Sequence, residues 1–266
     1  MRPLLEIGGR RAPFLRRSAL RLALSARRMS REGRVDDGRE EALLDFVRAH
    51  CPAGDLEGVI EAIDAFCYER AVMMNVGDEK GAILERAVAR ARTATALELG
   101  TYCGYSALRI IRAAGVRARL YSIERSPANA AVARAIIAHA GGSAQITVLE
   151  GSLEDGGATI ARLESEHGFA SACLDFLFID HDKQAYVPDL ERILQQRWLR
   201  KGAVVLADNV RVPGAPAYRA YMRANEGRRF LTTAHRTHLE YQSLIPDLML
   251  ESEYIGQGER TRQGGG

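Results

Sequence analysis

The chain has 266 residues, of which 47% are hydrophobic, and carries a formal net charge of +3. This length suits one large α/β domain with a substantial core, and no apolar run reaches the roughly 18–20 residues that a membrane-spanning helix needs. Four cysteines without a C-x-x-C pair, and no sign of a cleavable secretory signal, favour a cytoplasmic protein with reduced thiols over a disulfide framework or a zinc site.

The positive charge is concentrated at the N-terminus. Residues 1–34 hold ten arginines against two glutamates, a balance of +8, whereas the remainder has 27 basic and 32 acidic residues, a balance of −5. The basic pI is therefore no indication that the body binds nucleic acid. Apolar residues between Leu15 and Met29 share one helical face, and a basic amphipathic helix of this kind is typical of segments that bind weakly to an anionic membrane surface. The same pattern fits a flexible arm or a helix packed on the body. Residues 1–38 are interpreted as an arm and linker.

Helical spacing dominates residues 39–92. The segments EEALLDFVRAH (40–50), DLEGVIEAIDAFCYERAV (55–72) and AILERAVARAR (82–92) predict three helices. The glycine-containing stretch MMNVGDEKG (73–81) predicts a loop before the third of them.

From residue 95 onward, short apolar strands alternate with helices. Five strands are predicted at 95–100, 120–124, 146–151, 175–180 and 203–208. This alternation predicts an α/β domain with a doubly wound, mostly parallel sheet covered on both faces. Two later β-like segments, 229–235 and 247–254, predict an antiparallel hairpin at one edge, which makes seven strands. Residues 39–256 are interpreted as one domain, and the polar residues 257–266 as a disordered tail.

Ligands bind beyond the carboxyl ends of the strands in an open parallel sheet. Gly100 and Gly104 follow the first strand in ELGTYCGYS and permit a tight turn with close backbone approach to a ligand, although this is not the G-x-G-x-x-G of dinucleotide-binding proteins. Glu124 ends the second strand, where a carboxylate can accept hydrogen bonds from ribose hydroxyls and disfavours a 2′-phosphate. Together they indicate a nucleoside ligand, without separating NAD from S-adenosylmethionine.

Polar residues also end the fourth and fifth strands. Asp180 follows the fourth strand, and Asp208 with Asn209 follows the fifth. Carboxylate and amide oxygens at one edge of a sheet suit Mg²⁺, although a single strand-end aspartate is often only a helix cap. Lys183 lies near the start of the next helix, where a cation is electrostatically misplaced, which makes it a candidate general base as well as an ordinary surface lysine.

Five motifs in order carry a family resemblance: MNVGDEKG (74–81), LELGTYCGYSALR (97–109), IDHDK (179–183), LADNVRVPGAP (206–216) and HLEY (238–241). They resemble catechol O-methyltransferases, and the likeness extends from about residue 40 to 255. The resemblance implies a class I methyltransferase fold of Rossmann-like type. It also implies S-adenosylmethionine as methyl donor, a required Mg²⁺ and a small-molecule catechol as acceptor.

The same resemblance implies a role for individual residues. The cofactor would be bound by Met74, Val76, Glu98, Gly100, Tyr102, Ser106, Glu124, Ser152, Asp180 and His181. The metal would be held by Asp180, Asp208 and Asn209. The substrate would meet Asn209 and Pro213, with Lys183 as the general base and Glu240 as the partner of the second hydroxyl. A family serine near the third strand aligns with Leu153, or with Ser152 after a shift of one residue.

Two positions depart from the family pattern. Val72 and Asp182 stand where the family often has tryptophan, so the acceptor is less closely defined than the reaction. One alternative is a methyltransferase for another acceptor, such as a caffeoyl-coenzyme A-type phenolic or a nucleic acid. Another is a non-enzymatic, membrane-associated scaffold, against which the intact set Asp180, Lys183, Asp208, Asn209 and Glu240 weighs.

Overall fold

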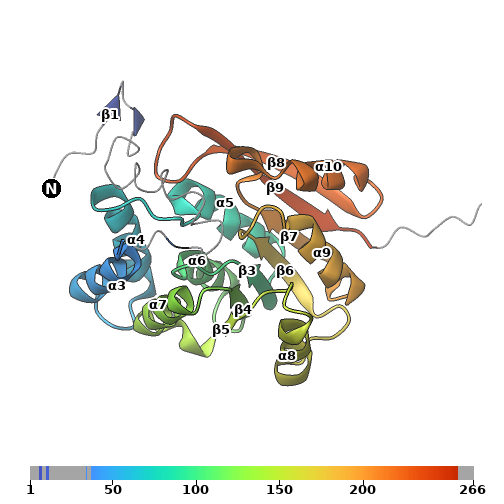
Figure 1. Cartoon of the computed structure of the whole chain (residues 1–266), viewed down its shortest axis with the longest axis horizontal. Coiled ribbons are helices and arrows are strands. Elements are labelled where there is room, and N and C mark those ends of the chain that lie inside the picture. The colour runs from blue at the N-terminus through green and yellow to red at the C-terminus, as the bar shows by residue number, and fades with distance from the viewer. Residues whose placement is uncertain (1–5, 8–9, 12–33, 35–36, 257–266) are drawn as a thin grey trace, which may run out of the picture.

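The computed structural model describes residues 6–7, 10–11, 34 and 37–256 (Figure 1). The predicted amphipathic segment 15–29 and the tail 257–266 lie outside these residues. Two short strands, β1 (Glu6–Ile7) and β2 (Arg10–Arg11), pair antiparallel within the N-terminal arm, where the sequence predicted no strand.

A seven-stranded sheet forms the centre of the body, in the order β5-β4-β3-β6-β7-β9-β8. Its first five strands are parallel, and β9 runs antiparallel to both β7 and β8. The predicted mostly parallel sheet with an antiparallel edge pair is thus confirmed. The strands are β3 (Thr95–Leu99), β4 (Arg119–Glu124), β5 (Ile146–Glu150), β6 (Leu174–Ile179), β7 (Leu199–Ala207), β8 (Phe230–His238) and β9 (Pro246–Tyr254).

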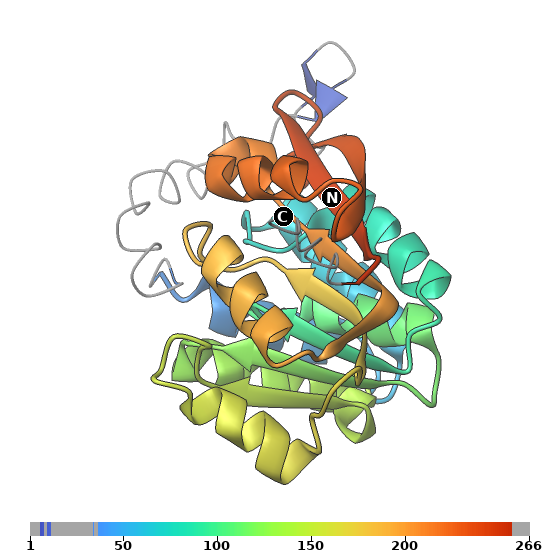
Figure 2. The same cartoon turned by 90° about the vertical axis from the view of Figure 1, so that its right-hand side faces the viewer.

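Helices cover both faces of the sheet, and Figure 2 shows α8, α9 and α10 in front of it. None of the helices among the described residues is both long enough and apolar enough to cross a lipid bilayer. The helices are α3 (Arg39–His50), α4 (Leu56–Glu69), α5 (Gly77–Arg90), α6 (Tyr105–Ala114), α7 (Pro127–His139), α8 (Ala158–His167), α9 (Tyr186–Gln195) and α10 (Pro216–Ala224), with a 3-10 turn η2 (Gly142–Ala144) and a π-helical turn η3 (Val210–Gly214).

The sheet separates two apolar clusters because successive side chains of a strand point to opposite faces. On the central strand β6, Phe176 and Phe178 join the cluster under α3 to α7. Leu177 and Ile179 join the cluster under α8 to α10. All four side chains are fully buried, which explains the apolar run over residues 176–179. Asp180, the first polar residue after this run, marks the sheet edge.

The third helix of the body begins earlier than its apolar pattern predicted. Residues 73–81 were expected to form a loop, but α5 begins at Gly77. Asp78 and Glu79 lie in its first turn, where negative side chains are stabilised by the positive end of the helix dipole. This local charge outweighs the helix-breaking tendency of Gly77 and Gly81, and it places Lys80 on a helix.

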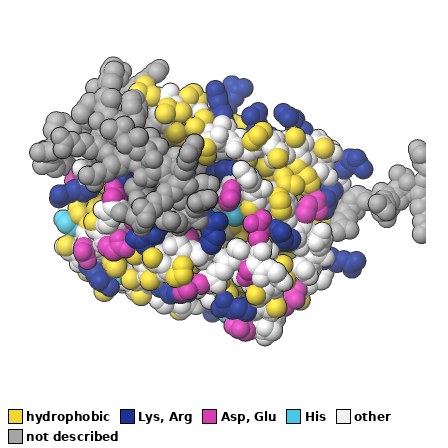
Figure 3. Space-filling view, in the orientation of Figure 1, with side chains coloured by type: hydrophobic (Ala, Val, Ile, Leu, Met, Phe, Trp, Pro, Cys, Tyr) yellow, Lys and Arg dark blue, Asp and Glu magenta, His cyan; other side chains and the backbone are white. Residues whose placement is uncertain are grey.

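Acidic and basic side chains are interspersed over much of the described surface visible in Figure 3. The large single-sign field that would steer a polyanion onto the body is not seen on the described part of this face.

Candidate active site

The strand order reverses between β3 and β6, so the carboxyl ends of these two strands flank the expected ligand crevice. At this point Gly100, with a φ of 102°, passes directly over the end of β6. A Cβ atom on Gly100 would lie 2.3 Å from the carbonyl oxygen of Asp180 and 3.2 Å from Cβ of His181. Only glycine fits here, and it lets the cofactor-side turn lie against the predicted metal-side residues.

Glu124 has a fixed orientation at the end of β4. Its Oε2 accepts a hydrogen bond from the backbone N–H of Tyr102 (2.8 Å), and its Oε1 accepts one from the backbone N–H of Ser126 (2.8 Å). Each carboxylate oxygen has further acceptor capacity. The side chain is therefore held rigidly by its own turn and by the turn after β3, and it can accept hydrogen bonds from a diol.

Glu98 lies on β3 beneath this turn and is fully buried. Its Oε2 accepts a hydrogen bond from Ser122, while its Oε1 has no partner among the described residues. Burial raises the pKa of Glu98 to about 8, against the lowering effect of the Ser106 and Ser122 hydroxyls. Ser106, at the start of α6, is also buried, so a polar pair lies below the glycine turn.

Tyr102 adopts a positive φ of 49° between the two glycines. Its hydroxyl donates to Oε1 of Glu40 on α3 (2.8 Å), a residue that is itself fully buried. The N-terminal helices thus close one side of the predicted cofactor site. Arg34, from the predicted linker, is 8% exposed and pairs with Glu41, so this linker residue packs against the body.

His181 follows Asp180 and stacks on Tyr186 with ring centroids 5.3 Å apart. Its Nε2 lies 2.8 Å from Oδ2 of Asp189, whereas its buried Nδ1 has no partner among the described residues. The Asp189 contact fixes the imidazole ring. The ring is therefore held in place with one buried, unpaired nitrogen.

The other predicted cofactor residues lie on the surrounding turns. Val76 is buried at the start of α5, and Met74 is half-buried in the preceding turn. Of the two alternatives after β5, Leu153 is part of the core, whereas Ser152 is half-buried and its Oγ accepts the backbone N–H of Glu154 (3.3 Å). Ser152 is therefore the partly exposed, polar member of the pair.

The predicted metal residues lie at the adjacent ends of β6 and β7. Oδ1 of Asp180 accepts a hydrogen bond from Lys183 (2.9 Å). Nδ2 of Asn209 donates to Oε1 of Glu240 and to Oδ2 of Asp247, both at 2.9 Å, which leaves its carbonyl oxygen as the remaining ligand atom. Asp208 is fully buried. Burial raises the pKa of Asp208, Lys80 opposes this shift, and the charges of Asp180 and Glu240 add to it.

Sequence reasoning missed Lys80. Its Nζ lies 2.9 Å from both carboxylate oxygens of Asp208 and 3.1 Å from Oδ2 of Asp247, and it also contacts Oε1 of Glu240. Burial alone would lower the pKa of Lys80, but the carboxylates of Asp208, Glu240 and Asp247 outweigh it and raise the pKa. The signal that drew attention to Lys183, a cation in a helix's first turn, applies equally to Lys80.

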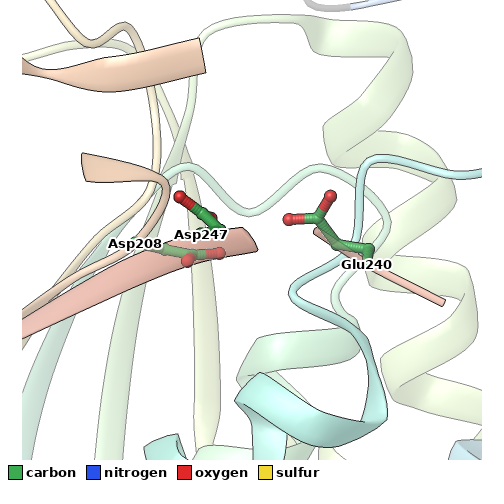
Figure 4. A group of neighbouring side chains, drawn as sticks. All are labelled: Asp208, Glu240 and Asp247. Carbon is green, nitrogen blue, oxygen red and sulfur yellow. The ribbon is translucent and has the colours of Figure 1, made fainter. Parts of the chain in front are cut away.

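Asp247, at the start of β9, was also missed. It is 1% exposed, and its carboxylate oxygens, with those of Asp208 and Glu240, lie within 4.8 Å of one another. Figure 4 shows Asp208 and Asp247 side by side, with Glu240 facing them. Oδ1 of Asp247 accepts the backbone N–H of Val212 (2.9 Å), so this residue also fixes the turn η3.

Lys183 lies in the turn before α9, with its side chain 18% exposed. Its Nζ donates to the hydroxyl oxygen of Tyr186 (2.6 Å), and that hydroxyl donates to the backbone carbonyl of Asp208 (3.0 Å). Asp182 points away from this contact: it is exposed, and its Oδ1 accepts the backbone N–H of Gln184 (3.0 Å). Asp182 caps the turn, whereas Lys183 enters the site.

Glu240 and Pro213, the predicted substrate residues, border the site from two further segments. Glu240 lies between β8 and β9, and the exposed Pro213 lies in η3. A pocket of about 590 Å³ opens between the first turn of α5 and residues 238–243, with Tyr68, Asp78 and Gln242 in its wall. The candidate substrate residue Glu240 therefore borders a hollow with a largely polar wall.

Comparison with known proteins defines the class. A family model described as O-methyltransferase matches residues 55–226, which is more than half of the chain. The chain therefore belongs to this O-methyltransferase family, and the expectation of a methyltransferase enzyme is confirmed.

Individual relatives narrow the class. The chain is 55% identical over 235 residues to a probable O-methyltransferase of Mycobacterium tuberculosis, covering 88% of this chain and all of the relative. It is 43% identical over 218 residues to catechol O-methyltransferase B of Danio rerio, covering 82% of this chain and 80% of the relative. The predicted resemblance to catechol O-methyltransferases is thus confirmed.

Solved structures agree on the fold. A crystal structure of the O-methyltransferase from Bacillus cereus in complex with SAH has a TM-score of 0.59 at 22% identity, covering 87% of this chain and 97% of that one. At this identity the likeness speaks for the fold alone, and it matches the predicted class I methyltransferase architecture.

Proposed function

We propose that this enzyme transfers a methyl group from S-adenosylmethionine to one hydroxyl of a catechol, in a Mg²⁺-dependent reaction with Lys183 as the general base. The observation that carries the proposal is the juxtaposition of Lys183 with the oxygen ligands at the ends of β6 and β7. Lys183 contacts Asp180 directly and reaches the backbone of Asp208 through Tyr186.

The donor set fits a hard divalent cation. Asp180, Asp208 and Asn209 offer only oxygen atoms as ligands, which is the chemistry Mg²⁺ prefers. Among the described residues, one ammonium, Lys80, lies close to the neighbouring carboxylates of Asp208, Glu240 and Asp247, so this cluster has a surplus of negative charge. Bound Mg²⁺ would supply positive charge that favours the ionised form of a coordinated hydroxyl.

The cofactor residues fit a nucleoside with a charged amino-acid end. The doubly anchored carboxylate of Glu124 would accept hydrogen bonds from the ribose hydroxyls. His181 would lie against the adenine, while Ser106 would hold the methionine carboxylate near the buried Glu98. Met74, Val76, Gly100 and Ser152 would border the rest of the cofactor, on the turns that Gly100 lets lie against the metal-side residues.

The chemical step then requires proton removal and alignment. The Lys183 amine takes the proton from the reacting hydroxyl, and Tyr186 holds that amine in place. Glu240 accepts a hydrogen bond from the second hydroxyl, and Pro213 limits the movement of the ring. Alignment of this kind supplies up to ~7–11 kcal/mol of a barrier in well-oriented cases. No covalent enzyme intermediate is needed.

A catechol panel tests the proposal. The protein is incubated with S-adenosylmethionine, Mg²⁺ and catechols that differ in size and charge, together with a caffeoyl-coenzyme A-type phenolic, and products are detected by the mass of one added methyl group. We expect methylated catechols, and no product after EDTA treatment. Product undiminished by EDTA would contradict the metal requirement, and turnover of the coenzyme A substrate alone would identify the alternative acceptor class.

Two variants sharpen the assignment. Asp208→Asn is expected to abolish EDTA-sensitive turnover, because it removes a charged ligand from the end of β7. Glu164→Gln serves as the control, since Glu164 is exposed on α8, away from the candidate site. Turnover by the Asp208 variant at the wild-type rate would contradict the metal role assigned to Asp208.

A further inference from the structure

The basic residues of this chain are almost all arginine. Of 37 basic residues, 34 are arginine and only three are lysine: Lys80, Lys183 and Lys201. Lys201 is exposed, whereas Lys80 and Lys183 both lie in the candidate active site. Two of the three lysines thus lie where a compact ammonium contacts carboxylates, and Lys80 has the larger set of such contacts.

The Lys80 ammonium is surrounded by carboxylates from three separate segments. Asp208 ends β7, Asp247 begins β9, and Glu240 lies in the connection between β8 and β9; all three contact Nζ. The Lys80 side chain is 1% exposed. An ammonium is a point charge that can accept neighbours from several directions, whereas the planar guanidinium of arginine directs its donors into a fixed fork.

A close backbone approach brings these segments together. Gly77, the first residue of α5, has a φ of 74°, and a Cβ atom placed on it would lie 3.3 Å from Cβ and 3.4 Å from Cα of Glu240. Lys80 follows three residues later, on the same face of the helix. The first turn of α5 therefore lies against Glu240 and presents the ammonium to its carboxylate.

The three carboxylates differ in their freedom to move. The side chains of Asp208 and Asp247 are fully buried, but that of Glu240 is 18% exposed. Without a cation between them, like charges repel, and Glu240 is the member that can turn toward solvent. Lys80 converts this repulsion into attraction, and Asn209 adds a hydrogen bond to Glu240 at 2.9 Å.

We propose that Lys80 is the residue that positions Glu240 over the acceptor side of the site, acting as the shared counter-cation of Asp208, Glu240 and Asp247, and that this task requires an ammonium. Lys80 touches no reacting atom in this scheme. Its effect on acceptor binding rests on the proposed function, whereas its effect on the position of Glu240 does not.

Hydrogen exchange in the metal-free, full-length protein tests the structural part. Peptides covering residues 238–245 are compared in wild type, Lys80→Met, Lys80→Arg and the control Lys201→Met. We expect both Lys80 variants to exchange about tenfold faster in this segment, which corresponds to about 1.4 kcal/mol of local stability, and Lys201→Met to match wild type. Wild-type exchange in Lys80→Met would overturn the proposal, and wild-type exchange in Lys80→Arg would overturn the requirement for an ammonium.

A second variant approaches the same contact from the other side. Glu240→Gln removes the carboxylate charge that pairs with Lys80 and leaves the buried contacts of Lys80 with Asp208 and Asp247 intact. This variant therefore provides a decisive test even if Lys80→Met does not fold. Its segment 238–245 is expected to exchange faster than in wild type. Unchanged exchange in Glu240→Gln would show that the segment is held by its other contacts, such as the hydrogen bond from Tyr241 to Asp64, and would overturn the proposal.

Kinetics separate positioning from a general loss of structure. In Lys80→Met the acceptor KM is expected to rise about tenfold while the S-adenosylmethionine Kd, measured by calorimetry, stays at the wild-type value. The double variant with Glu240→Gln is expected to be no worse than Lys80→Met, because the two changes remove one contact. Fully additive effects, or an equal loss of cofactor affinity, would overturn the assignment. An enzyme that methylates no catechol would contradict the proposed function and leave the exchange result to decide on Lys80.

Discussion

The Nζ atom of Lys183 lies 2.6 Å from the hydroxyl oxygen of Tyr186. Because that hydroxyl donates its own hydrogen to the backbone carbonyl of Asp208, it can only accept from Lys183. The fully buried Tyr186 therefore joins the ends of β6 and β7. It fixes the candidate base relative to the candidate metal ligand Asp208, which it contacts only through the backbone carbonyl.

Removal of this hydroxyl should impair catalysis more than cofactor binding. Tyr186→Phe is expected to lower kcat about tenfold, equivalent to about 1.4 kcal/mol, because Lys183 loses the contact that aims it. The S-adenosylmethionine Kd should stay unchanged. Tyr218→Phe is the control, since Tyr218 is equally buried and packs against Tyr186, but its hydroxyl has no partner among the described residues. Equal kcat values for the two variants would contradict the role of Tyr186.

Glu98 should make stability depend on pH. Its raised pKa means that the folded protein binds this proton more tightly than the unfolded chain. The resulting contribution to stability is present below the ordinary pKa near 4.5 and is lost as the pH rises through about 8. Glu98→Gln has no carboxyl group to titrate at this position. The Tm of the variant minus the Tm of wild type is therefore expected to increase between about pH 5 and about pH 9, because wild type loses the Glu98 contribution over this range.

Thermal unfolding of the ligand-free protein over this range measures the effect. Glu164→Gln, on the exposed surface of α8, serves as the control and should show a constant difference from wild type. A Tm difference between Glu98→Gln and wild type that stays flat with pH would rule out this linkage.

Gly77 should tolerate no side chain. Gly77→Ala combines a positive φ, which costs an alanine roughly 1–2 kcal/mol, with a contact against Glu240 at 3.3 Å. Gly168→Ala is the matched control, because Gly168 has a left-handed conformation with a φ of 71° and nothing within 4 Å of the added methyl group. Denaturant unfolding should show a larger loss for Gly77→Ala, accompanied by a higher acceptor KM. Identical losses in the two variants would mean that the Glu240 contact is unimportant.

The arginine-rich arm should account for any attraction to membranes. Residues 1–34 carry a net charge of +8, and the remainder carries −5. Arg34 is buried against the body, so a truncation should remove residues 1–33 only. We expect the full chain to co-sediment with anionic vesicles in a salt-sensitive manner and the truncated chain to stay in the supernatant with unchanged methyltransferase activity. Equal sedimentation of both would place the contact on the body.

Much of the architecture is local in origin and was predictable. The change from helical to strand periodicity at residue 95 predicted the parallel sheet, because hydrophobic period reflects which faces a segment buries. Polar residues at strand ends, such as Glu124 and Asp180, predicted the edge that carries the candidate site, since parallel strands all end on the same side. The antiparallel pair β8 and β9 followed from two β-like segments beyond the last helix.

Contacts between distant segments were decided by tertiary structure. Lys80 and Asp247 are 167 positions apart, and Lys80 and Asp208 are 128 apart. Nothing in the sequence near Asp247 marks it as part of a charge cluster, because an aspartate at the start of a strand is ordinary. The cluster arises only where α5 packs against the edge hairpin.

The sequence by itself determined the fold class, and it indicated the edge of the sheet that carries the candidate site and the candidate oxygen ligands at that edge. These features depend on periodicity and on where each strand ends, and both are properties of contiguous residues. Only the tertiary structure decided that Tyr186 orients Lys183 and that Lys80 shares its charge among three carboxylates. Electrostatic energy depends on distance in space, and the chain order of Lys80, Asp208, Glu240 and Asp247 contains no information about that distance.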